Sequence, residues 1–384
     1  MDQAREAGGE GVLQAGERRS TRIESLRAVA ALAVLTSHGL LAGGGYYHEL
    51  PRTLAFGGSL GVFLFFALTG YLLFLPFARR ASGDGRPIDL RRYALNRAVR
   101  VLPLYYVVLV VFLLVNEHGG TATQWWRFAT FSQSFFSDTV STVDGPMWSL
   151  VVEIQFYALL PLLAWGVTRV ARGSRAAAAA AILALAFASA AVWWFEVGRV
   201  GGSDLRWKYS LPATFFNFTP GMLLALLRLE LLDRPRAWLP PSSVLLAAGA
   251  LVWAAAADQL TYPQPLAAAA AFLVVGAVVL PVADGRLARL LDARVLVTIG
   301  LASYSLYLWH HPIVLSLGQR LDAGPAAVAL AGLAVCIPIA LASYALVERP
   351  FLRLRRRWGP TAATPPAVEP ATGIAPLEAG RGAA

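Results

Sequence analysis

The sequence predicts an all-α polytopic integral membrane protein with about ten transmembrane helices and with cytoplasmic N- and C-termini. Three observations support this fold class. The 384 residues are 57% hydrophobic and 15% charged, with a mean hydropathy of +0.56. The apolar residues form runs of about 20 residues, the length that a helix needs to cross the hydrocarbon core of a bilayer. The basic residues lie mainly between these runs, and mostly on one side of the predicted membrane.

Each apolar run is expected to form one membrane-spanning helix. In chain order, the predicted spans are residues 23–43, 57–78, 98–116, 148–167, 175–195, 210–228, 242–258, 265–283, 295–317 and 325–347. With a cytoplasmic N-terminus, 27 of the 33 basic residues fall on the inner side, and the other six are Arg52, Arg127, Arg199, Arg206, Lys208 and Arg320. This asymmetry follows the positive-inside rule. It also explains the net charge of +10 without any nucleic acid partner.

Two tails flank the predicted membrane domain, which covers residues 22–357. Residues 1–21 are polar, mixed in charge and rich in glycine, and residues 358–384 are rich in Pro, Ala and Gly, so both are expected to be disordered cytoplasmic tails. A cleavable signal peptide is the alternative for the N-terminus, but the long mixed-charge start favours a retained helix. The single cysteine, Cys336, excludes an intrachain disulfide and a cysteine metal cluster.

The first span carries Arg27 near one end and His38 near the other. Ionisable groups in lipid cost a few kcal/mol each, so a helix that keeps two is expected to use or pair them. Their separation is about three helical turns, which places both on one face. The structural alternative is a histidine bonded to a neighbouring helix and an arginine that reaches the headgroups.

The next two spans differ in character. The second contains the small residues Gly58, Gly61, Thr69 and Gly70, which predict close contact between helices. The third begins with an arginine pair, Arg97 and Arg100, whose spacing puts both on one helix face. These arginines either anchor the helix at the inner surface or bind the phosphates of a cytoplasmic ligand.

The long predicted external loop, residues 116–147, contains the amphipathic sequence WWRFATFSQSFF, which predicts an interfacial helix or a lid. Glu153 follows in the first two turns of the fourth span. Spans five, seven and eight are rich in Ala and Leu and are interpreted as scaffold. Pro220 and Gly221 predict a kink or a break in the sixth span.

The ninth span ends in YSLYLWHHP, with His310 and His311 side by side. Adjacent helical residues point about 100° apart, so the two rings cannot easily bind one metal ion, and no metal site is expected. The tenth span ends at Glu348, Arg349 and Pro350.

The ionisable groups fall into two sets by depth. At about 1.5 Å per helical residue, His38, Glu153 and His310 lie at a similar level. The three arginines Arg27, Arg97 and Arg100 instead gather at the inner edge. The sequence therefore predicts one polar cavity with two levels, in which anion-binding arginines lie below a histidine base that a carboxylate can orient.

This arrangement suits proton abstraction from a hydroxyl near neutral pH, because histidine is the natural base there and a carboxylate partner would stabilise the imidazolium. No serine or cysteine stands out as a nucleophile, so direct transfer to an activated acceptor is the simpler mechanism. The same residues fit a proton-coupled transporter, since membrane-embedded His and Glu also serve in proton relays. The residues alone leave enzyme and transporter open, with a structural protein as a third alternative.

Seven motifs, in order along residues 20–356, resemble those of the membrane-bound acyltransferase-3 family of acyl-CoA-dependent O-acyltransferases. They are Arg27-x10-His38, GVFLFFALTGYLL, Arg97-x-x-Arg100 with Pro103 and Tyr105, WSLVVEIQFY, the Gly221 region, YSLYLWHHP and VERPF. The resemblance implies that His38 is the catalytic histidine and Arg27 its motif partner, that Arg97 and Arg100 contact acyl-CoA, and that Glu153 and His310 are further functional positions. Thr69 stands where the family usually has serine, and His311 occupies a variable position to which no function is transferred.

The resemblance also implies a reaction and its partners. It predicts transfer of an acyl group, usually acetyl, from cytoplasmic acyl-CoA to a hydroxyl of a carbohydrate or of a glycosylated or polyketide (macrolide-type) acceptor, without a metal. The expected location is the bacterial cytoplasmic membrane. Some relatives append a C-terminal hydrolase-like domain, and none is recognisable here. The membrane domain is therefore expected to act alone, as a homo-oligomer, or with a separate extracytoplasmic transferase.

Overall fold

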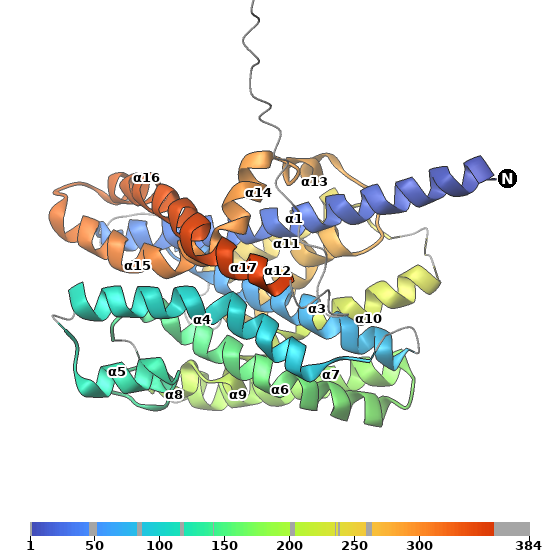
Figure 1. Ribbon diagram of the computed structural model, residues 1–384, viewed down its shortest axis with the longest axis horizontal. Helices are drawn as coiled ribbons and strands as arrows, with labels where there is room; N and C mark the ends of the chain where they lie inside the picture. The colour runs from blue at the N-terminus through green and yellow to red at the C-terminus, as the bar shows by residue number, and fades with distance from the viewer. Residues whose placement is uncertain are drawn as a thin grey trace, which may run out of the picture.

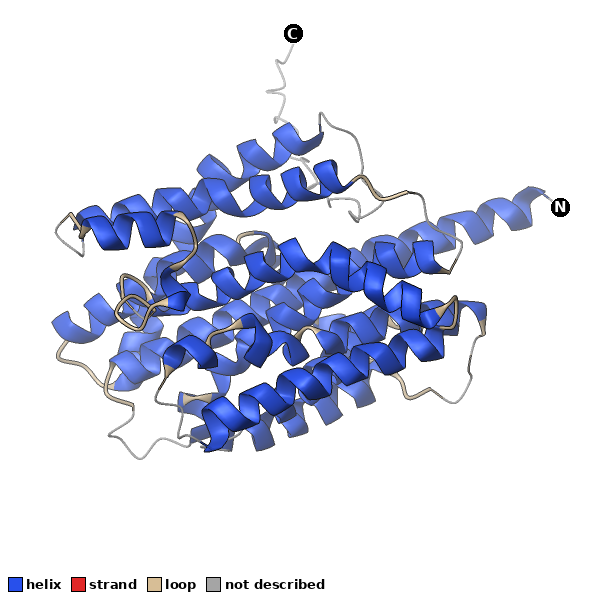
Figure 2. Ribbon diagram, turned by 90° about the horizontal axis from the view of Figure 1, so that it is seen from below, coloured by secondary structure: helices blue, strands red, loops and turns tan. Residues whose placement is uncertain are grey.

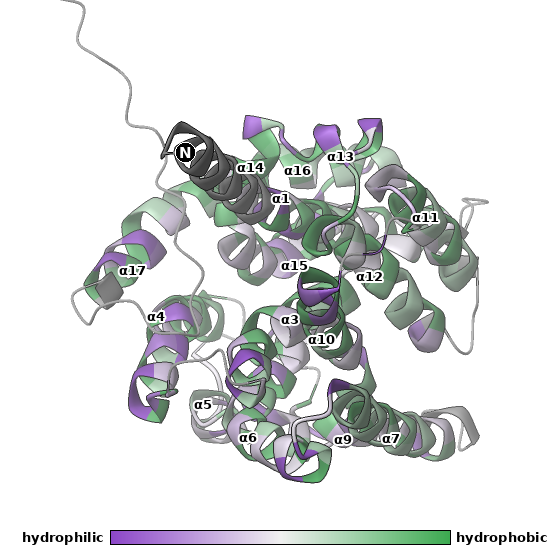
Figure 3. Cartoon of the chain, turned by 90° about the vertical axis from the view of Figure 1, so that its right-hand side faces the viewer, coloured by the Kyte–Doolittle hydropathy of each residue, from purple (hydrophilic) through white to green (hydrophobic). Residues whose placement is uncertain are grey.

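The computed structural model describes residues 2–45, 52–82, 87–115, 119–140, 142–199, 204–234, 236, 239–258 and 263–356. Throughout these ranges the regular elements are all helices, and none is a strand (Figure 1, Figure 2). Most of the long helices run roughly along one direction and form a bundle, which Figure 3 shows from the end at which the first helix begins. The predicted all-α fold is confirmed.

The α-helices and the short 3₁₀ and π segments, labelled η, follow one another along the chain. They are α1 (Asp2–Ala42), α2 (Arg52–Ala55), η1 (Gly57–Leu60), α3 (Gly61–Ala81), α4 (Leu90–Val115), α5 (Ala122–Ala129), η2 (Gln133–Phe135), η3 (Gly145–Met147), α6 (Trp148–Ala171), α7 (Arg175–Trp193), η4 (Trp194–Arg199), α8 (Leu205–Lys208), α9 (Leu211–Thr214), η5 (Phe215–Asn217), α10 (Thr219–Asp233), α11 (Ser242–Asp258), α12 (Pro263–Val279), α13 (Arg286–Leu290), α14 (Arg294–Leu301), α15 (Ser303–Arg320), α16 (Pro325–Ser343), η6 (Tyr344–Glu348) and α17 (Arg349–Arg356).

Seven helical segments within the described residues are long and apolar enough to cross a membrane. They are Thr21–Ala42, Gly57–Ala81, Leu90–Val115, Gly145–Ala171, Arg175–Glu196, Leu211–Asp233 and Pro325–Leu354. Two shorter apolar helices, α11 and α12, occupy the predicted seventh and eighth spans. The predicted ninth span is divided at Ala302 into α14 and α15. A helix therefore lies at every predicted span, while the count of ten and the orientation remain predictions.

The structure describes the two predicted tails to different extents. Helix α1 begins at Asp2, so helix continues over residues 2–20, where a disordered tail was expected. Residues 358–384 lie outside the described part of the chain. The division into a membrane domain and two tails remains a prediction.

Helix α3 lies at the centre of the bundle and is crossed closely by α1 and α10. A Cβ atom added to Gly221 of α10 would lie 1.8 Å from the Ala67 carbonyl oxygen, and one added to Gly70 of α3 would lie 2.1 Å from that of Phe218. A Cβ atom added to Gly58, just before α3, would lie 2.0 Å from the Ala33 carbonyl oxygen of α1. No other residue fits such approaches, so the predicted packing role of Gly58 and Gly70 is confirmed, and Gly221 has a packing role that was not predicted.

The sixth predicted span is interrupted as expected. It consists of α9, the 3₁₀ turn η5 and α10, and Pro220 lies in the first turn of α10. Proline is tolerated there because the first backbone N–H groups of a helix have no partner within it. The break therefore lies just before the Pro220-Gly221 pair.

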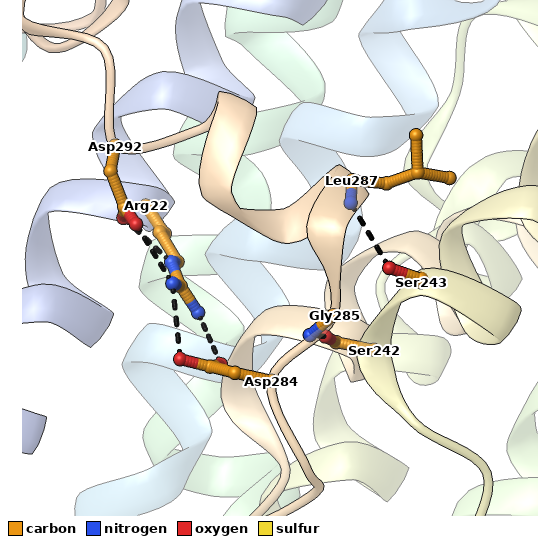
Figure 4. A network of polar contacts seen from close by, with 7 residues as sticks. All are labelled: Arg22, Ser242, Ser243, Asp284, Gly285, Leu287 and Asp292. Carbon is orange, nitrogen blue, oxygen red and sulfur yellow. Dashed lines mark hydrogen bonds and ion pairs between the residues drawn. The ribbon is translucent and has the colours of Figure 1, made fainter.

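Arg22 ties the start of the first predicted span to the segments on both sides of α13 (Figure 4). Its side chain is 7% exposed and lies 2.7 Å from both Asp284 and Asp292. In the same region the Ser242 hydroxyl accepts a hydrogen bond from the Gly285 backbone N–H at 2.8 Å. These contacts fix the position of α1 relative to α11 and α13.

The predicted amphipathic segment begins within α5, whose N-terminus is closed by a capping box between Thr121 and Gln124. Phe128 is buried and Trp126 is half exposed. The Tyr105 hydroxyl of α4 donates to the Phe128 carbonyl at 2.8 Å, which holds α5 across the end of α4. Its position relative to a membrane surface remains a prediction.

Candidate active site

His38 of α1 and His310 of α15 form a hydrogen-bonded pair. The His38 Nδ1 atom lies 2.8 Å from the His310 Nε2 atom. His310 is 1% exposed, and its Nδ1 atom lies 2.6 Å from the backbone carbonyl oxygen of Tyr307. The prediction that the two histidines share one depth in the bundle is confirmed.

These contacts fix the proton positions on both neutral rings. A carbonyl oxygen only accepts hydrogen bonds, so the proton of His310 is on Nδ1 and its Nε2 atom is an acceptor. The bond between the rings then requires a proton on Nδ1 of His38. The His38 Nε2 atom is left with a free lone pair, which is the atom that a general base needs.

A cavity of about 100 Å³ lies near this pair. Its charged and polar lining residues come from α1, α3, α4, α6 and α15. They are Arg27, Thr69, Arg97, Arg100, Ser149, Glu153, Tyr157, Ser303, Tyr304 and Tyr307. The three predicted arginines and Glu153 therefore meet in one cavity.

Tyr307 lies between this cavity and the histidine pair. It lines the cavity, and its ring is centred 5.5 Å from that of His310. Its hydroxyl lies 2.8 Å from the Ser149 hydroxyl. Since neither histidine is among the lining residues, the predicted cavity with two open levels is corrected to an arginine-lined cavity with a histidine pair behind Tyr307.

Glu153 does not have the partner that the sequence suggested. Its Oε1 atom accepts a hydrogen bond from the Thr69 hydroxyl at 2.7 Å. His38 instead uses its Nδ1 atom to contact His310. A second histidine thus contacts His38 where a carboxylate was expected, and Thr69, interpreted from sequence as a packing residue, donates a hydrogen bond to the Glu153 carboxylate.

The three arginines have different surroundings. Arg100 lies 3.0 Å from Glu348, whose other oxygen accepts from the Ser305 hydroxyl at 2.5 Å. Arg27 donates to the Ser303 hydroxyl at 3.3 Å. The Nε atom of Arg97 is buried and has no hydrogen-bond partner, although its guanidinium lies over the Tyr157 ring. Arg97 is therefore the one of the three best suited to receive an added anion.

Asp144 and His311 lie beside the histidine pair. The Asp144 Oδ1 atom is 3.0 Å from His311 Nδ1, and the His311 ring stands edge-on to that of His38 with centres 5.1 Å apart. Burial raises the pKa of the Asp144 carboxyl, and His311 opposes that shift. Sequence reasoning set His311 aside and missed Asp144, Tyr307 and Glu348, although Tyr307 and Glu348 lie within the quoted YSLYLWHHP and VERPF motifs.

Despite three neighbouring histidines, the described residues contain no group of three or more His, Cys, Asp or Glu side chains arranged to hold a metal ion. That the chemistry proceeds without a metal remains a prediction. The cavity and the histidine pair together offer an imidazole nitrogen with a free lone pair, the Glu153 carboxylate and the Arg97 guanidinium.

The sequence profile of the acyltransferase-3 family, which describes an acyltransferase domain, matches residues 21–345. The chain belongs to this family. The match begins within α1 and ends within η6, so it contains every predicted site residue of the chain.

Three curated relatives illustrate the similarity of this chain to known proteins. "Putative peptidoglycan O-acetyltransferase YrhL" of Bacillus subtilis is 30% identical over 365 residues, which cover 86% of this chain and 54% of the relative. "Peptidoglycan O-acetyltransferase OatA" of Listeria monocytogenes is 25% identical, covering 76% of this chain and 49% of the relative. "Putative membrane-bound transacylase BcsY" of Komagataeibacter xylinus is 28% identical and covers 78% of both chains.

The chain thus spans about half the length of the first two relatives. No solved structure matches it. The activity, the acyl group, the donor and the acceptor therefore belong to the proposal that follows.

Proposed function

We propose that this protein transfers an acyl group, most simply acetyl, from acyl-CoA on the cytoplasmic side of the bacterial cell membrane to a hydroxyl of a carbohydrate or a glycosylated or polyketide acceptor. The observation that carries the proposal is the free Nε2 lone pair of His38, which its contact with His310 leaves available. The names of the peptidoglycan O-acetyltransferases agree with a glycan acceptor.

The proposed reaction balances without a covalent enzyme intermediate. His38 Nε2 takes the proton of the acceptor hydroxyl while the hydroxyl oxygen attacks the thioester carbonyl. The carbon–sulfur bond then breaks, and His38 returns the proton to the departing thiolate. His310 stabilises the transient His38 imidazolium, because its Nε2 atom accepts a hydrogen bond from His38 Nδ1.

The cavity supports the donor assignment. Arg27 and Arg97 place positive charge in its wall, and guanidinium groups match phosphate oxygens in geometry as well as charge. The buried Nε atom of Arg97 gains a partner when an anion binds. In this proposal the thioester end of the donor must pass Tyr307 to reach His38, because Tyr307 lines the cavity and its ring is centred 5.5 Å from that of His310.

The direct test is thiol release by the purified full-length protein in lipid nanodiscs. With acetyl-CoA and a hydroxyl acceptor, we expect free CoA and an acceptor heavier by one acetyl group, measured by a thiol reagent and by mass spectrometry. His38→Ala protein is the matched control. Uptake of substrate by proteoliposomes that carry the same protein, without thiol release, would support the transporter alternative and contradict the proposal.

A further inference from the structure

The Asp144–His311 pair adjoins the proposed base but is not used in the mechanism above. His311 contacts Asp144 of the loop before α6, and its ring faces the edge of His38. The titratable groups next to His311 are Asp144, His38 and His310, whose ring is centred 6.1 Å away. Any role of His311 therefore takes place next to His38, the residue proposed to take the proton.

Asp144 needs a partner because its carboxylate is buried. Its side chain is 1% exposed, and neither oxygen has a hydrogen-bond partner of good geometry. A buried carboxylate without a hydrogen bond is costly. The Nδ1 atom of His311, at 3.0 Å, is within ion-pair distance. A small rotation of either group makes a hydrogen bond that places the His311 proton on Nδ1.

With its proton on Nδ1, a neutral His311 presents Nε2 as a hydrogen-bond acceptor. The space beside the Cε1–Nε2 edge of the His311 ring is open in part because residue 145 is glycine. A Cβ atom at Gly145 would lie 3.4 Å from His311 Cε1 and 3.8 Å from Nε2. The His311 side chain is 21% exposed, so a ligand can reach it where it cannot reach Asp144.

We propose that His311, held by Asp144, accepts a hydrogen bond from a second hydroxyl of the acceptor, beside the hydroxyl that His38 deprotonates. The acceptor is then a polyhydroxylated compound, such as a sugar with neighbouring hydroxyls. This inference rests on the proposed acyl transfer and narrows its acceptor class. Asp144 is a positioning residue, because it acts through His311.

The spacing of the rings fits such a ligand. Hydrogen bonds from hydroxyls are about 2.7–3.0 Å long, and two neighbouring sugar hydroxyls can each reach one of two imidazoles centred 5.1 Å apart. A site that binds a hydroxyl discriminates against an analogue without it, because the site's buried polar group is left unpaired. We expect the wild type to prefer the complete acceptor roughly 10- to 100-fold in kcat/KM.

The experiment compares methyl glucoside with its four monodeoxy analogues, using acetyl-CoA and the full-length protein in nanodiscs. For the wild type, one analogue should lose acylation because it lacks the reacting hydroxyl, and a second should be acylated roughly 10- to 100-fold less well because it lacks the neighbouring hydroxyl. His311→Ala and Asp144→Asn should remove the preference against the second analogue while keeping the KM for acetyl-CoA. Gln319→Ala, elsewhere on α15, is the matched control and should keep the preference.

Gly145→Ala provides a variant that keeps both polar side chains. The added methyl group meets the His311 ring at contact distance, so we expect a raised KM for methyl glucoside and an unchanged melting temperature. If the His311→Ala and Asp144→Asn proteins both kept the preference against the second deoxy analogue, the inference would be overturned. Acylation of simple alcohols but of no glycoside would also overturn it. Absence of thiol release with every acceptor would instead overturn the proposed function.

Discussion

Arg100 and Glu348 form an ion pair inside the wall of the cavity, with Nη1 and Oε2 3.0 Å apart and side-chain exposures of 17% and 2%. The two residues are 248 positions apart in the chain. Glu348 ends the π-helical segment η6, and its second oxygen is fixed by Ser305. This pair distinguishes Arg100 from Arg97, although both belong to one sequence motif.

The first prediction follows from this difference. Arg97→Ala should raise the KM for acetyl-CoA at least tenfold and leave the KM for acetyl-pantetheine nearly unchanged, because only the full donor carries the nucleotide phosphates. Arg100→Ala should lower stability as well, by about 3–5 kcal/mol, since it leaves the buried Glu348 carboxylate unpaired. Steady-state kinetics and thermal unfolding in detergent measure the two effects.

A double variant is the control for Arg100. Arg100→Met with Glu348→Leu removes both charges and should restore most of the stability that Arg100→Ala loses. Equal loss of stability in the single and double variants would contradict a role for the pair as an ion pair.

The second prediction concerns the histidine pair. His38→Ala should lower kcat by roughly 10²–10⁴, the usual contribution of a general base, without changing the KM for acetyl-CoA. His310→Ala should lower kcat less, because it removes the partner that sets the proton on His38 Nδ1. His310→Gln should recover part of this loss, since its side-chain oxygen can accept the same hydrogen bond. Identical rates for the Ala and Gln variants at residue 310 would contradict the tautomer argument.

The third prediction tests the contact between Thr69 and Glu153. Thr69→Ser keeps the hydroxyl and should retain near wild-type turnover, whereas Thr69→Val removes the hydrogen bond at the same volume. If the Glu153 charge serves the reaction, Glu153→Gln and Thr69→Val should both lower kcat and shift the pH–rate profile. If the Thr69→Val protein kept the wild-type kcat, Thr69 would have only a packing role.

The fourth prediction concerns topology, which the distribution of basic residues suggests. In a Cys336→Ala background, a cysteine at the exposed position Ser137 should react with an impermeant maleimide added outside intact cells. A cysteine at Ala81, exposed at the end of α3, should react only after the cells are opened. The reverse pattern would place the arginine-lined cavity toward the outside and contradict a cytoplasmic donor.

The sequence was sufficient for the fold class and for the common depth of His38 and His310, but it placed Glu153 at their level, whereas Glu153 lines the cavity with the three arginines. Apolar runs identify helices that can cross a bilayer, and the helical rise gives the level of each residue along its own axis. That reasoning placed His38 and His310 at one depth and gathered Arg27, Arg97 and Arg100, as the structure shows.

Only the tertiary structure decided which side chains meet. Depth along a helix says nothing about the rotation of that helix or about which helices are neighbours, because these depend on packing among all of them. Glu153 was therefore predicted to orient His38. In the packed bundle, Glu153 instead accepts a hydrogen bond from Thr69, and His38 is hydrogen-bonded to His310. The break between α14 and α15 and the π-helical turn before Arg349 were not predicted either, because local sequence periodicity does not indicate such interruptions.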